Sequence, residues 1–247
     1  MNPVHFIRGS LALAVMPFLT AAVSLGTLID MRWGRKDPNK ALQFPSFWGR
    51  ALCAIAGIRV RVTGRENIDP DKTYIFVGNH TSQTDIWTFQ GFIPHHIRWV
   101  AKKELFAIPL FGAAMRSVGF VSIDRARGRA AVKSLNDAAG QIAGGASVIL
   151  FPEGTRSPDG RLRPFKTGAI MLAIKAGVPV VPVGFNGNHQ VLPKGSLIAR
   201  SGPVELRIGT PIATTGFKAK DKQELALRLQ QEVADLLDEA HQPLPGE

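Results

Sequence analysis

The chain contains almost no cysteine. Cys53 is the single one in 247 residues, which excludes an internal disulfide bond and any zinc site built from several cysteines. Its neighbours over residues 51–55 are small or apolar, so we predict a packing residue and not a nucleophile. No group of histidine, aspartate and glutamate has the spacing of a metal site, and we predict neither a metal nor a cofactor.

Nucleic-acid-binding motifs are also missing. The sequence has no zinc-finger spacing, no RNP aromatic pattern and no basic helix followed by a zipper. It does have an excess of positive charge, with 30 Lys and Arg against 19 Asp and Glu and a formal net charge of +11. The charge therefore favours an anionic membrane surface or a phosphorylated substrate as partner, and we predict no nucleic acid.

Charged residues are absent from residues 9–29, a mostly apolar stretch. A bilayer needs about 20 such residues, so this stretch can span it, although Pro17 and Gly26 could instead bend it into a re-entrant hairpin. A cleaved signal peptide is the rival interpretation, because Arg8 precedes the stretch and small residues lie within it. More basic charge follows the stretch than precedes it, which favours a retained anchor with the rest of the chain in the cytoplasm.

A second apolar segment covers residues 44–58, with its apolar residues at helical spacing. It is either a core helix or an interfacial helix with Trp48 at the level of the lipid headgroups. We therefore predict membrane-associated helices over residues 1–58, one globular domain over 59–241 and a frayed tail over 242–247.

The globular part alternates short β-rich runs with helical stretches. The predicted strands are Arg59–Thr63, Tyr74–Gly78, Arg98–Ala101, Gly119–Ile123, Ser147–Phe151, Val178–Phe185 and Val204–Ile208. The predicted helices are Asp85–Phe92, Glu104–Ser117, Ala126–Gly144, Thr167–Ala176 and one that opens at Asp221. This alternation predicts an α/β sandwich around a partly parallel mixed sheet. The prolines of Val178–Val183 deny ladder donors, so this run is either an edge strand or the wall of a groove.

His80 and Asp85 follow an apolar run and lie five residues apart. Histidine is well suited to take a proton near neutral pH, and an aspartate bonded to its other ring nitrogen would fix its tautomer. The alternative is structural, because Ser82 and Asp85 have the spacing of a capping box. Both can hold if Asp85 lies in the first turn of a helix and His80 lies in the turn just before it.

Three other segments follow predicted strands, where function usually lies in α/β folds. In Phe151–Ser157, Gly154 allows close backbone approach to a ligand and Arg156 offers a fork of donors for phosphate; an exposed hairpin tip is the alternative. The second segment ends with Arg125, a second candidate phosphate ligand at the end of a strand, and the third segment is Val178–Val183. Lys103, outside these segments, is a third candidate phosphate ligand.

These four segments, in this order, resemble the four motifs of the glycerolipid acyltransferase family. The resemblance rests on residues 79–85, 119–125, 151–157 and 178–183, and it spans roughly residues 60–210. It implies that His80 deprotonates the hydroxyl of an acceptor, which attacks an acyl thioester directly, while Asp85 orients the imidazole. It also implies that other motif residues bind the acceptor phosphate or shape its pocket. The candidate substrate-binding residues are Lys103, Arg125, Glu153, Gly154, Thr155, Arg156 and Pro182.

A carboxylate is unexpected beside a phosphate. We therefore expect Glu153 to pair with an arginine and hold its loop. A thioester is already activated, so no covalent enzyme intermediate is needed. Ser82 is the competing nucleophile, but no Gly-x-Ser-x-Gly elbow surrounds it. Backbone amides near the start of the Asp85 helix are candidate donors to the oxyanion.

The resemblance implies a membrane-associated enzyme of phospholipid biosynthesis, in the cytoplasmic (inner) membrane with its active site facing the cytoplasm. Its donor would be acyl-CoA or acyl carrier protein, and its acceptor 1-acylglycerol-3-phosphate, giving phosphatidic acid. The same chemistry would serve a lyso-ornithine lipid, glycerol-3-phosphate or another lysophospholipid. A hydrolase and a non-catalytic lipid-binding protein are alternatives from other classes.

Overall fold

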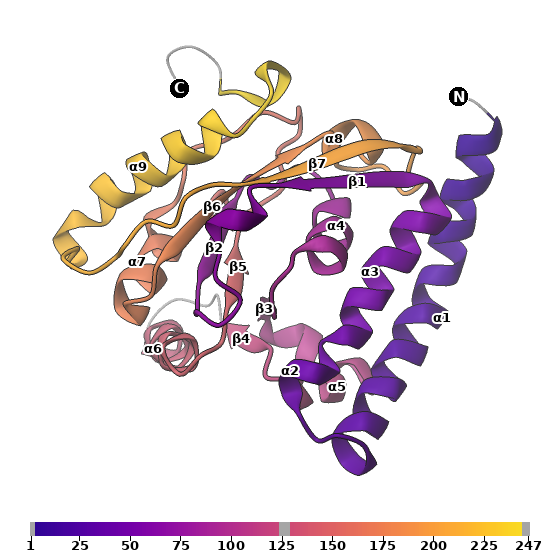
Figure 1. Cartoon of the computed structure of the whole chain (residues 1–247), viewed down its shortest axis with the longest axis horizontal. Coiled ribbons are helices and arrows are strands. Elements are labelled where there is room, and N and C mark those ends of the chain that lie inside the picture. Colours follow the sequence, from indigo (N-terminus) through magenta and orange to yellow (C-terminus); the bar gives the residue numbers. More distant parts are fainter. Residues whose placement is uncertain (1–2, 124–128, 244–247) are drawn as a thin grey trace.

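A computed structural model describes residues 3–123 and 129–243 of the chain (Figure 1). Within these ranges seven strands form one sheet in the order β1-β7-β6-β2-β5-β3-β4. Neighbouring strands are parallel except β6 and β7, which are antiparallel. The strands are β1 Ile58–Thr63, β2 Ile75–Gly78, β3 Arg98–Lys102, β4 Val121–Ile123, β5 Val148–Leu150, β6 Val180–Asn186 and β7 Gly202–Ile208. The predicted mixed, mostly parallel sheet is therefore confirmed.

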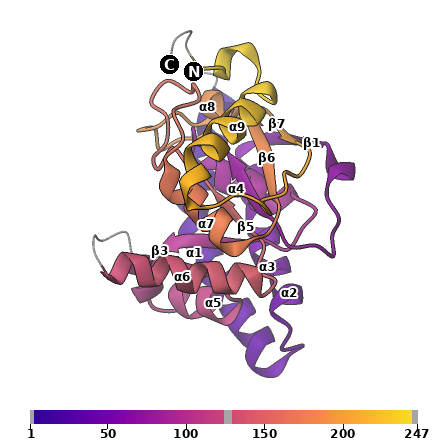
Figure 2. The same ribbon diagram turned by 90° about the vertical axis from the view of Figure 1, so that its left-hand side faces the viewer.

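Helices cover both faces of this sheet. The α-helices are α1 Pro3–Trp33, α2 Pro38–Ala41, α3 Gln43–Ala56, α4 Thr84–Phe92, α5 Phe111–Ser117, α6 Arg129–Ala143, α7 Thr167–Ala176, α8 Asn188–Val191 and α9 Lys222–Asp235. Short 3-10 helices are η1 Arg65–Asn67, η2 Lys103–Ala107, η3 Ala219–Asp221 and η4 Glu239–His241. Figure 2 shows α6, α7 and α9 in front of the strands, on the side away from α1 and α3.

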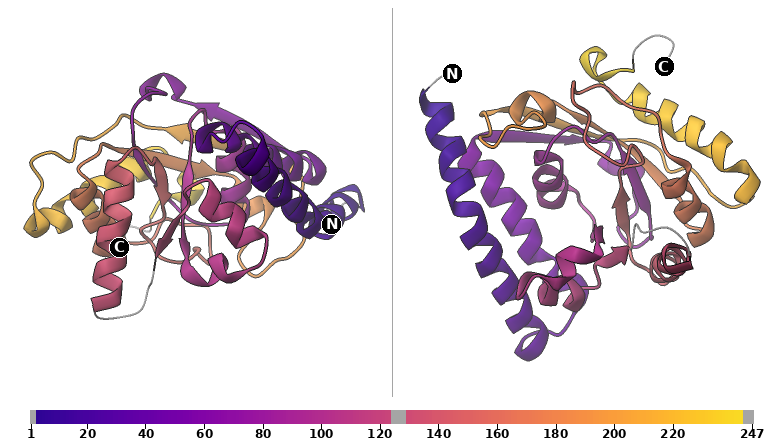
Figure 3. Two further views of the ribbon diagram at one scale, coloured as in Figure 1. Left: turned by 90° about the horizontal axis from the view of Figure 1, so that it is seen from below. Right: turned by 180° about the vertical axis from the view of Figure 1, so that it is seen from behind.

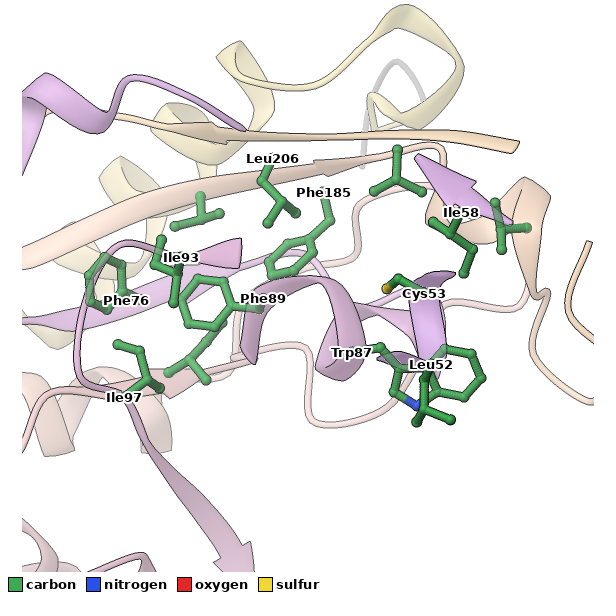
Figure 4. Close-up of a cluster of buried hydrophobic side chains, with 14 of the residues drawn as sticks. Leu52, Cys53, Ile58, Phe76, Trp87, Phe89, Ile93, Ile97, Phe185 and Leu206 are labelled. Atoms are coloured by element: carbon green, nitrogen blue, oxygen red, sulfur yellow. The ribbon is translucent and has the colours of Figure 1, made fainter. Parts of the chain in front are cut away.

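The two cores follow from the alternation of side chains along the strands. In the buried strand β2, Ile75 and Val77 belong to the core beneath α6, α7 and α9, while Phe76 belongs to the core on the other face. Figure 4 shows the second core, where Phe76, Phe89 and Phe185 gather. Cys53 is fully buried there, and burial raises the pKa of its thiol to about 12, as expected for a packing residue.

A close crossing of α3 and α4 holds the helix that carries Asp85. A Cβ atom on Gly49 would lie 2.5 Å from the carbonyl oxygen of Trp87, and one on Gly91 would lie 2.8 Å from the backbone nitrogen of Arg50. Glycine is therefore required on both helices where their backbones meet. This contact fixes α4 against α3 and so fixes the position of the first turn of α4.

Residues 9–29 lie within α1, which continues through Pro17 as one helix, so the re-entrant hairpin is not formed. Among the described residues, α1 is the one helix long and apolar enough to cross a membrane, by length and composition alone. The chain then turns through α2, and α3 runs back beside α1 (Figures 1 and 3). Trp48 in α3 donates a hydrogen bond from Nε1 to the Thr20 hydroxyl, 2.9 Å away.

The N-terminal end of α1 is also joined to the domain. Arg8 donates from Nε to the carbonyl oxygen of Ile55, 3.0 Å away, at the end of α3, where helix carbonyls lack partners of their own. A Cβ atom on the next residue, Gly9, would clash with the carbonyl oxygen of Ala199, so α1 lies directly against that segment. The first helix is thus packed into the folded body at its beginning and along its length.

One predicted helix is wrong in detail, and one of the two alternatives for the Val178–Val183 run is excluded. The single helix expected over Glu104–Ser117 is split into η2 and α5, because Pro109 has no N–H and disfavours helical backbone at the residue before it. The Val178–Val183 run is not at an edge, because β6 lies between β7 and β2. Pro182 is tolerated there because its carbonyl accepts from Gly209, so its missing N–H lies on the β7 side, beyond the end of that strand.

The expected tail over residues 242–247 is described only in part. The Gln242 side chain donates to the carbonyl oxygen of Ala234, 2.7 Å away, and so ties this residue to α9. Residues 244–247 lie outside the described residues.

Candidate active site

The site lies where β2 ends in the middle of the sheet. Asn79, the first residue after β2, is buried, and its side-chain amide bonds to both backbone groups of Phe185 in β6, at 3.0 and 2.8 Å. This pair of bonds continues the sheet for one more residue through a side chain. His80 follows at the carboxyl end of the strand, the usual position of a ligand site in an α/β sheet.

His80 and Asp85 are in contact. Nδ1 of His80 lies 2.8 Å from Oδ2 of Asp85, whose side chain is fully buried, while 18% of the His80 side chain is exposed. The same carboxylate oxygen accepts the backbone N–H groups of Thr81 and Ser82, at 2.8 and 2.9 Å. An ionised carboxylate only accepts hydrogen bonds, so the proton of a neutral imidazole lies on Nδ1 and Nε2 keeps a lone pair.

The spacing argument predicted this arrangement, with Asp85 in the first turn of α4 and His80 just before it. The capping role is present too, because Asp85 accepts from the Ser82 N–H and the Ser82 hydroxyl accepts from the N–H of Thr84. One carboxylate therefore starts the helix and holds the histidine.

Phe151 fixes the plane of the imidazole. Its ring stacks on His80 with centroids 4.1 Å apart and planes 14° from parallel. Phe151 also contacts the rings of Trp99 and Phe185, so the stack is anchored in the core. The sequence assigned Phe151 to a motif but no role; an aromatic residue directly after a buried strand was the available signal.

Glu153 lies beneath the histidine. It is 2% exposed, and its Oε1 accepts the backbone N–H of His80 at 2.7 Å, while its Oε2 has no partner among the described residues. Burial, with the nearby charge of Asp85, raises the pKa of Glu153 to about 8, although the His80 N–H and Arg163 act in the opposite direction. The carboxyl is therefore protonated at neutral pH.

The expected arginine pair of Glu153 is not found, since no arginine forms an ion pair with it in the part of the chain that the structure describes. The reason is its burial, which places the carboxyl against backbone and not at the surface. The same loop also donates the N–H of Ser157 to the carbonyl oxygen of His80, at 2.7 Å. Residues 153–157 thus hold the His80 backbone from both sides.

The remaining candidates lie in three different environments. Gly154 has the left-handed φ of 77°, Thr155 is exposed and Arg156 is half-buried, all on the loop that holds His80. Lys103 is exposed at the start of η2, directly after β3. Pro182 is buried within β6, and Arg125 lies outside the described residues.

Ser82 is not available as a nucleophile. Its side chain is fully buried and its hydroxyl donates to the carbonyl oxygen of Leu192, 2.7 Å away. The backbone amides expected to stabilise an oxyanion already donate to other groups. The N–H groups of Thr81 and Ser82 donate to the Asp85 carboxylate, and the N–H of Thr84 donates to the Ser82 hydroxyl. The start of α4 therefore supports the histidine, and these three N–H groups do not face a reacting atom.

Known proteins share this framework. A family model described as Acyltransferase matches residues 59–186, more than half of the chain and all of the site described above. The chain belongs to this acyltransferase family. The family resemblance of the four motifs is thereby confirmed, and the chain is an acyltransferase.

Two sequence relatives of this acyltransferase are named 1-acyl-sn-glycerol-3-phosphate acyltransferase. The protein from Cocos nucifera is 34% identical over 88% of this chain and 70% of its own length. The protein from Pseudomonas aeruginosa is 33% identical over 75% of this chain and 71% of its own length. A solved structure, the 1-acyl-sn-glycerophosphate (LPA) acyltransferase PlsC from Thermotoga maritima, is 31% identical with a TM-score of 0.74, covering 93% of this chain and 97% of that one.

Proposed function

We propose that this acyltransferase transfers a fatty acyl group from acyl-CoA or acyl carrier protein to 1-acylglycerol-3-phosphate and so makes phosphatidic acid. The observation that carries the proposal is the 2.8 Å contact between His80 and Asp85, which leaves Nε2 as a base. The names of the relatives from Cocos nucifera and Pseudomonas aeruginosa support the acceptor.

The reaction needs one proton shuttle. Nε2 of His80 takes the proton of the acceptor hydroxyl, and the oxygen forms a bond to the thioester carbonyl carbon. The tetrahedral intermediate then collapses, the carbon–sulfur bond breaks, and the thiolate takes the proton back from the imidazolium. Asp85 stabilises the imidazolium, while Phe151 keeps the ring in plane. No enzyme-bound acyl group is required.

Glu153 positions the base and does not bind phosphate. A neutral carboxyl accepts the His80 N–H without adding a second negative charge beside Asp85. The candidate cations for binding the phosphate are Arg156, Arg125 and Lys103. Arg156 is the strongest of these, because it lies on the loop that holds His80.

The enzyme works at the cytoplasmic face of the inner membrane. Large apolar side chains are exposed along α1 and at one position of α3, which supports membrane association: Val4, Phe6, Ile7, Leu11, Phe18, Leu25, Ile29, Trp33 and Phe47. The net charge of +11 suits anionic lipids and an anionic acceptor.

Removing the base tests the mechanism. His80→Ala is expected to abolish acyl transfer to lysophosphatidic acid while binding to anionic vesicles survives, because α1 and α3 are unchanged. Thin-layer analysis of labelled phosphatidic acid and free fatty acid separates transfer from hydrolysis. Near-normal turnover of this variant would refute the role of His80.

A second variant tests the phosphate site. Arg156→Ala should raise the KM for lysophosphatidic acid by about tenfold or more and leave the KM for acyl-CoA nearly unchanged, since a hydrogen bond to a charged group contributes roughly 1.5–3 kcal/mol. A panel with lyso-ornithine lipid, glycerol-3-phosphate and other lysophospholipids, at one acyl-CoA concentration, identifies the preferred acceptor. Equal effects on both KM values would contradict the assignment.

A further inference from the structure

A lysine outside the four motif segments lies against the loop that holds His80. Lys166 directly precedes α7, and its backbone N–H donates to the carbonyl oxygen of Pro152 at 3.0 Å. Its side chain lies over Gly154, because a Cβ atom at Gly154 would be 3.0 Å from Nζ and 3.4 Å from Cδ of Lys166. The ammonium group therefore lies beside the glycine that follows Glu153 and precedes Arg156 by two residues.

No carboxylate of the described residues pairs with this ammonium group. In residues 3–123 and 129–243, neither the Lys166 ammonium nor the Arg156 guanidinium has an ion pair or a side-chain hydrogen bond. Lys72 and Lys133, by contrast, pair with neighbouring aspartates. Two carboxyl groups lie near these cations in sequence: Glu153 is buried and accepts from the His80 backbone, and Asp159 accepts from the Ser157 hydroxyl and the Arg161 N–H.

The backbone of the loop adds donors to these cations. Gly154 adopts a left-handed conformation, and the N–H groups of Thr155 and Arg156 that follow have no acceptor in the described part of the chain. Successive N–H groups beside a left-handed residue form a concavity that binds anions. The turn therefore carries Arg156 and two amides, with the Lys166 ammonium beside Gly154, and no carboxylate of the described residues pairs with either cation.

We propose that Lys166 binds the phosphate of the acceptor together with Arg156 and the two loop amides, and so selects a phosphorylated acceptor over an uncharged one. This proposal rests on the proposed function. It concerns the acceptor and not the donor, because the attacking hydroxyl of 1-acylglycerol-3-phosphate is on the carbon next to the one that carries the phosphate. The phosphates of CoA are separated from the thioester by the long pantetheine arm.

The test compares Lys166→Met with Lys166→Arg and with Lys175→Met in the full-length enzyme. Lys175 is a matched control on α7, where its ammonium donates to the Asn136 side chain, 2.9 Å away. Steady-state KM and kcat are measured for lysophosphatidic acid, for monoacylglycerol as an acceptor without phosphate, and for acyl-CoA. Because Lys166 is exposed, the thermal unfolding midpoint of each variant should match that of the wild type.

We expect Lys166→Met to raise the KM for lysophosphatidic acid about tenfold, a loss of about 1.4 kcal/mol, with no change in kcat/KM for monoacylglycerol or in the KM for acyl-CoA. Lys166→Arg should recover most of this loss, and Lys175→Met should behave as the wild type. An unchanged KM for lysophosphatidic acid, or an increase confined to acyl-CoA, overturns the proposal while leaving the proposed function intact. A wild-type enzyme that fails to acylate lysophosphatidic acid overturns the proposed function, and this proposal with it.

Discussion

Replacing Glu153 with glutamine should make the folded enzyme more stable as the pH rises, relative to the wild type. In the folded protein burial raises the pKa of Glu153 to about 8, from an ordinary value of 4.5. Between these two values the unfolded chain has lost the proton and the folded chain still holds it. The unfolded state thus binds fewer protons, and the free energy of unfolding of the wild type falls as the pH increases.

The size of the effect follows from the same two values. Each pH unit in this window lowers the free energy of unfolding by about 1.4 kcal/mol for one proton. From about pH 5 to about pH 8 the loss is roughly 3 kcal/mol, since the slope flattens near each pKa. Glutamine cannot ionise, and it keeps an oxygen for the N–H of His80. The side-chain NH2 group of the glutamine has no acceptor there, which lowers the free energy of unfolding of the variant by an amount that does not vary with pH.

Urea unfolding of both proteins, followed by tryptophan fluorescence in detergent at several pH values, measures the difference directly. We expect the difference between Glu153→Gln and the wild type to grow by roughly 3 kcal/mol in favour of glutamine over this window. Glu153→Ala is the control for the lost hydrogen bond, because it removes the acceptor of the His80 N–H and the titration together. A difference that stays flat with pH would show that Glu153 is ionised in the folded enzyme, and the argument from burial would be wrong.

Three further predictions concern the same region. The kcat/KM of the wild type should fall above about pH 8, where Glu153 ionises beside Asp85, and this fall should be absent in Glu153→Gln; a pH–rate profile that is the same for both contradicts it. Ser82→Ala should lose about 1–3 kcal/mol of stability and keep its kcat, because the hydroxyl is buried and hydrogen-bonded; loss of turnover in a folded variant would restore Ser82 as a nucleophile. Gly49→Ala should lose about 1–3 kcal/mol, because its Cβ atom would lie 2.5 Å from the Trp87 carbonyl oxygen. The control Gly140→Ala has open space in α6 and should be neutral or stabilising by up to about 1 kcal/mol in thermal unfolding; equal losses in both would remove the argument from close approach.

Features set by residues close together in the sequence were predictable, such as the bounds of a helix and contacts across one turn. The helix Thr167–Ala176 is found with its predicted bounds, and Gly177 ends it in the left-handed conformation that glycine favours. The contact between His80 and Asp85 was also predictable, because a short turn and the start of one helix bring the two together.

Contacts between distant segments were not predictable from local patterns. The bond between Glu153 and the His80 N–H joins residues 73 positions apart, and the stack of Phe151 on His80 depends on β2 and β5 being neighbours. The order of the strands in the sheet also cannot be predicted from the local sequence pattern. The prolines of the Val178–Val183 run therefore left an edge strand as one of two alternatives, although β6 lies inside the sheet.

The attachment of α1 has a mechanical consequence. Arg8 binds the end of α3, Gly9 lies against Ala199, and Trp48 bonds to Thr20, so the first helix cannot act as a flexible tether. The fold therefore sets the height and the tilt of His80 relative to α1, and so relative to any lipid surface that α1 contacts. Under the proposed function, a lipid acceptor in that surface has to cover this set distance to reach His80, because α1 holds the domain in place.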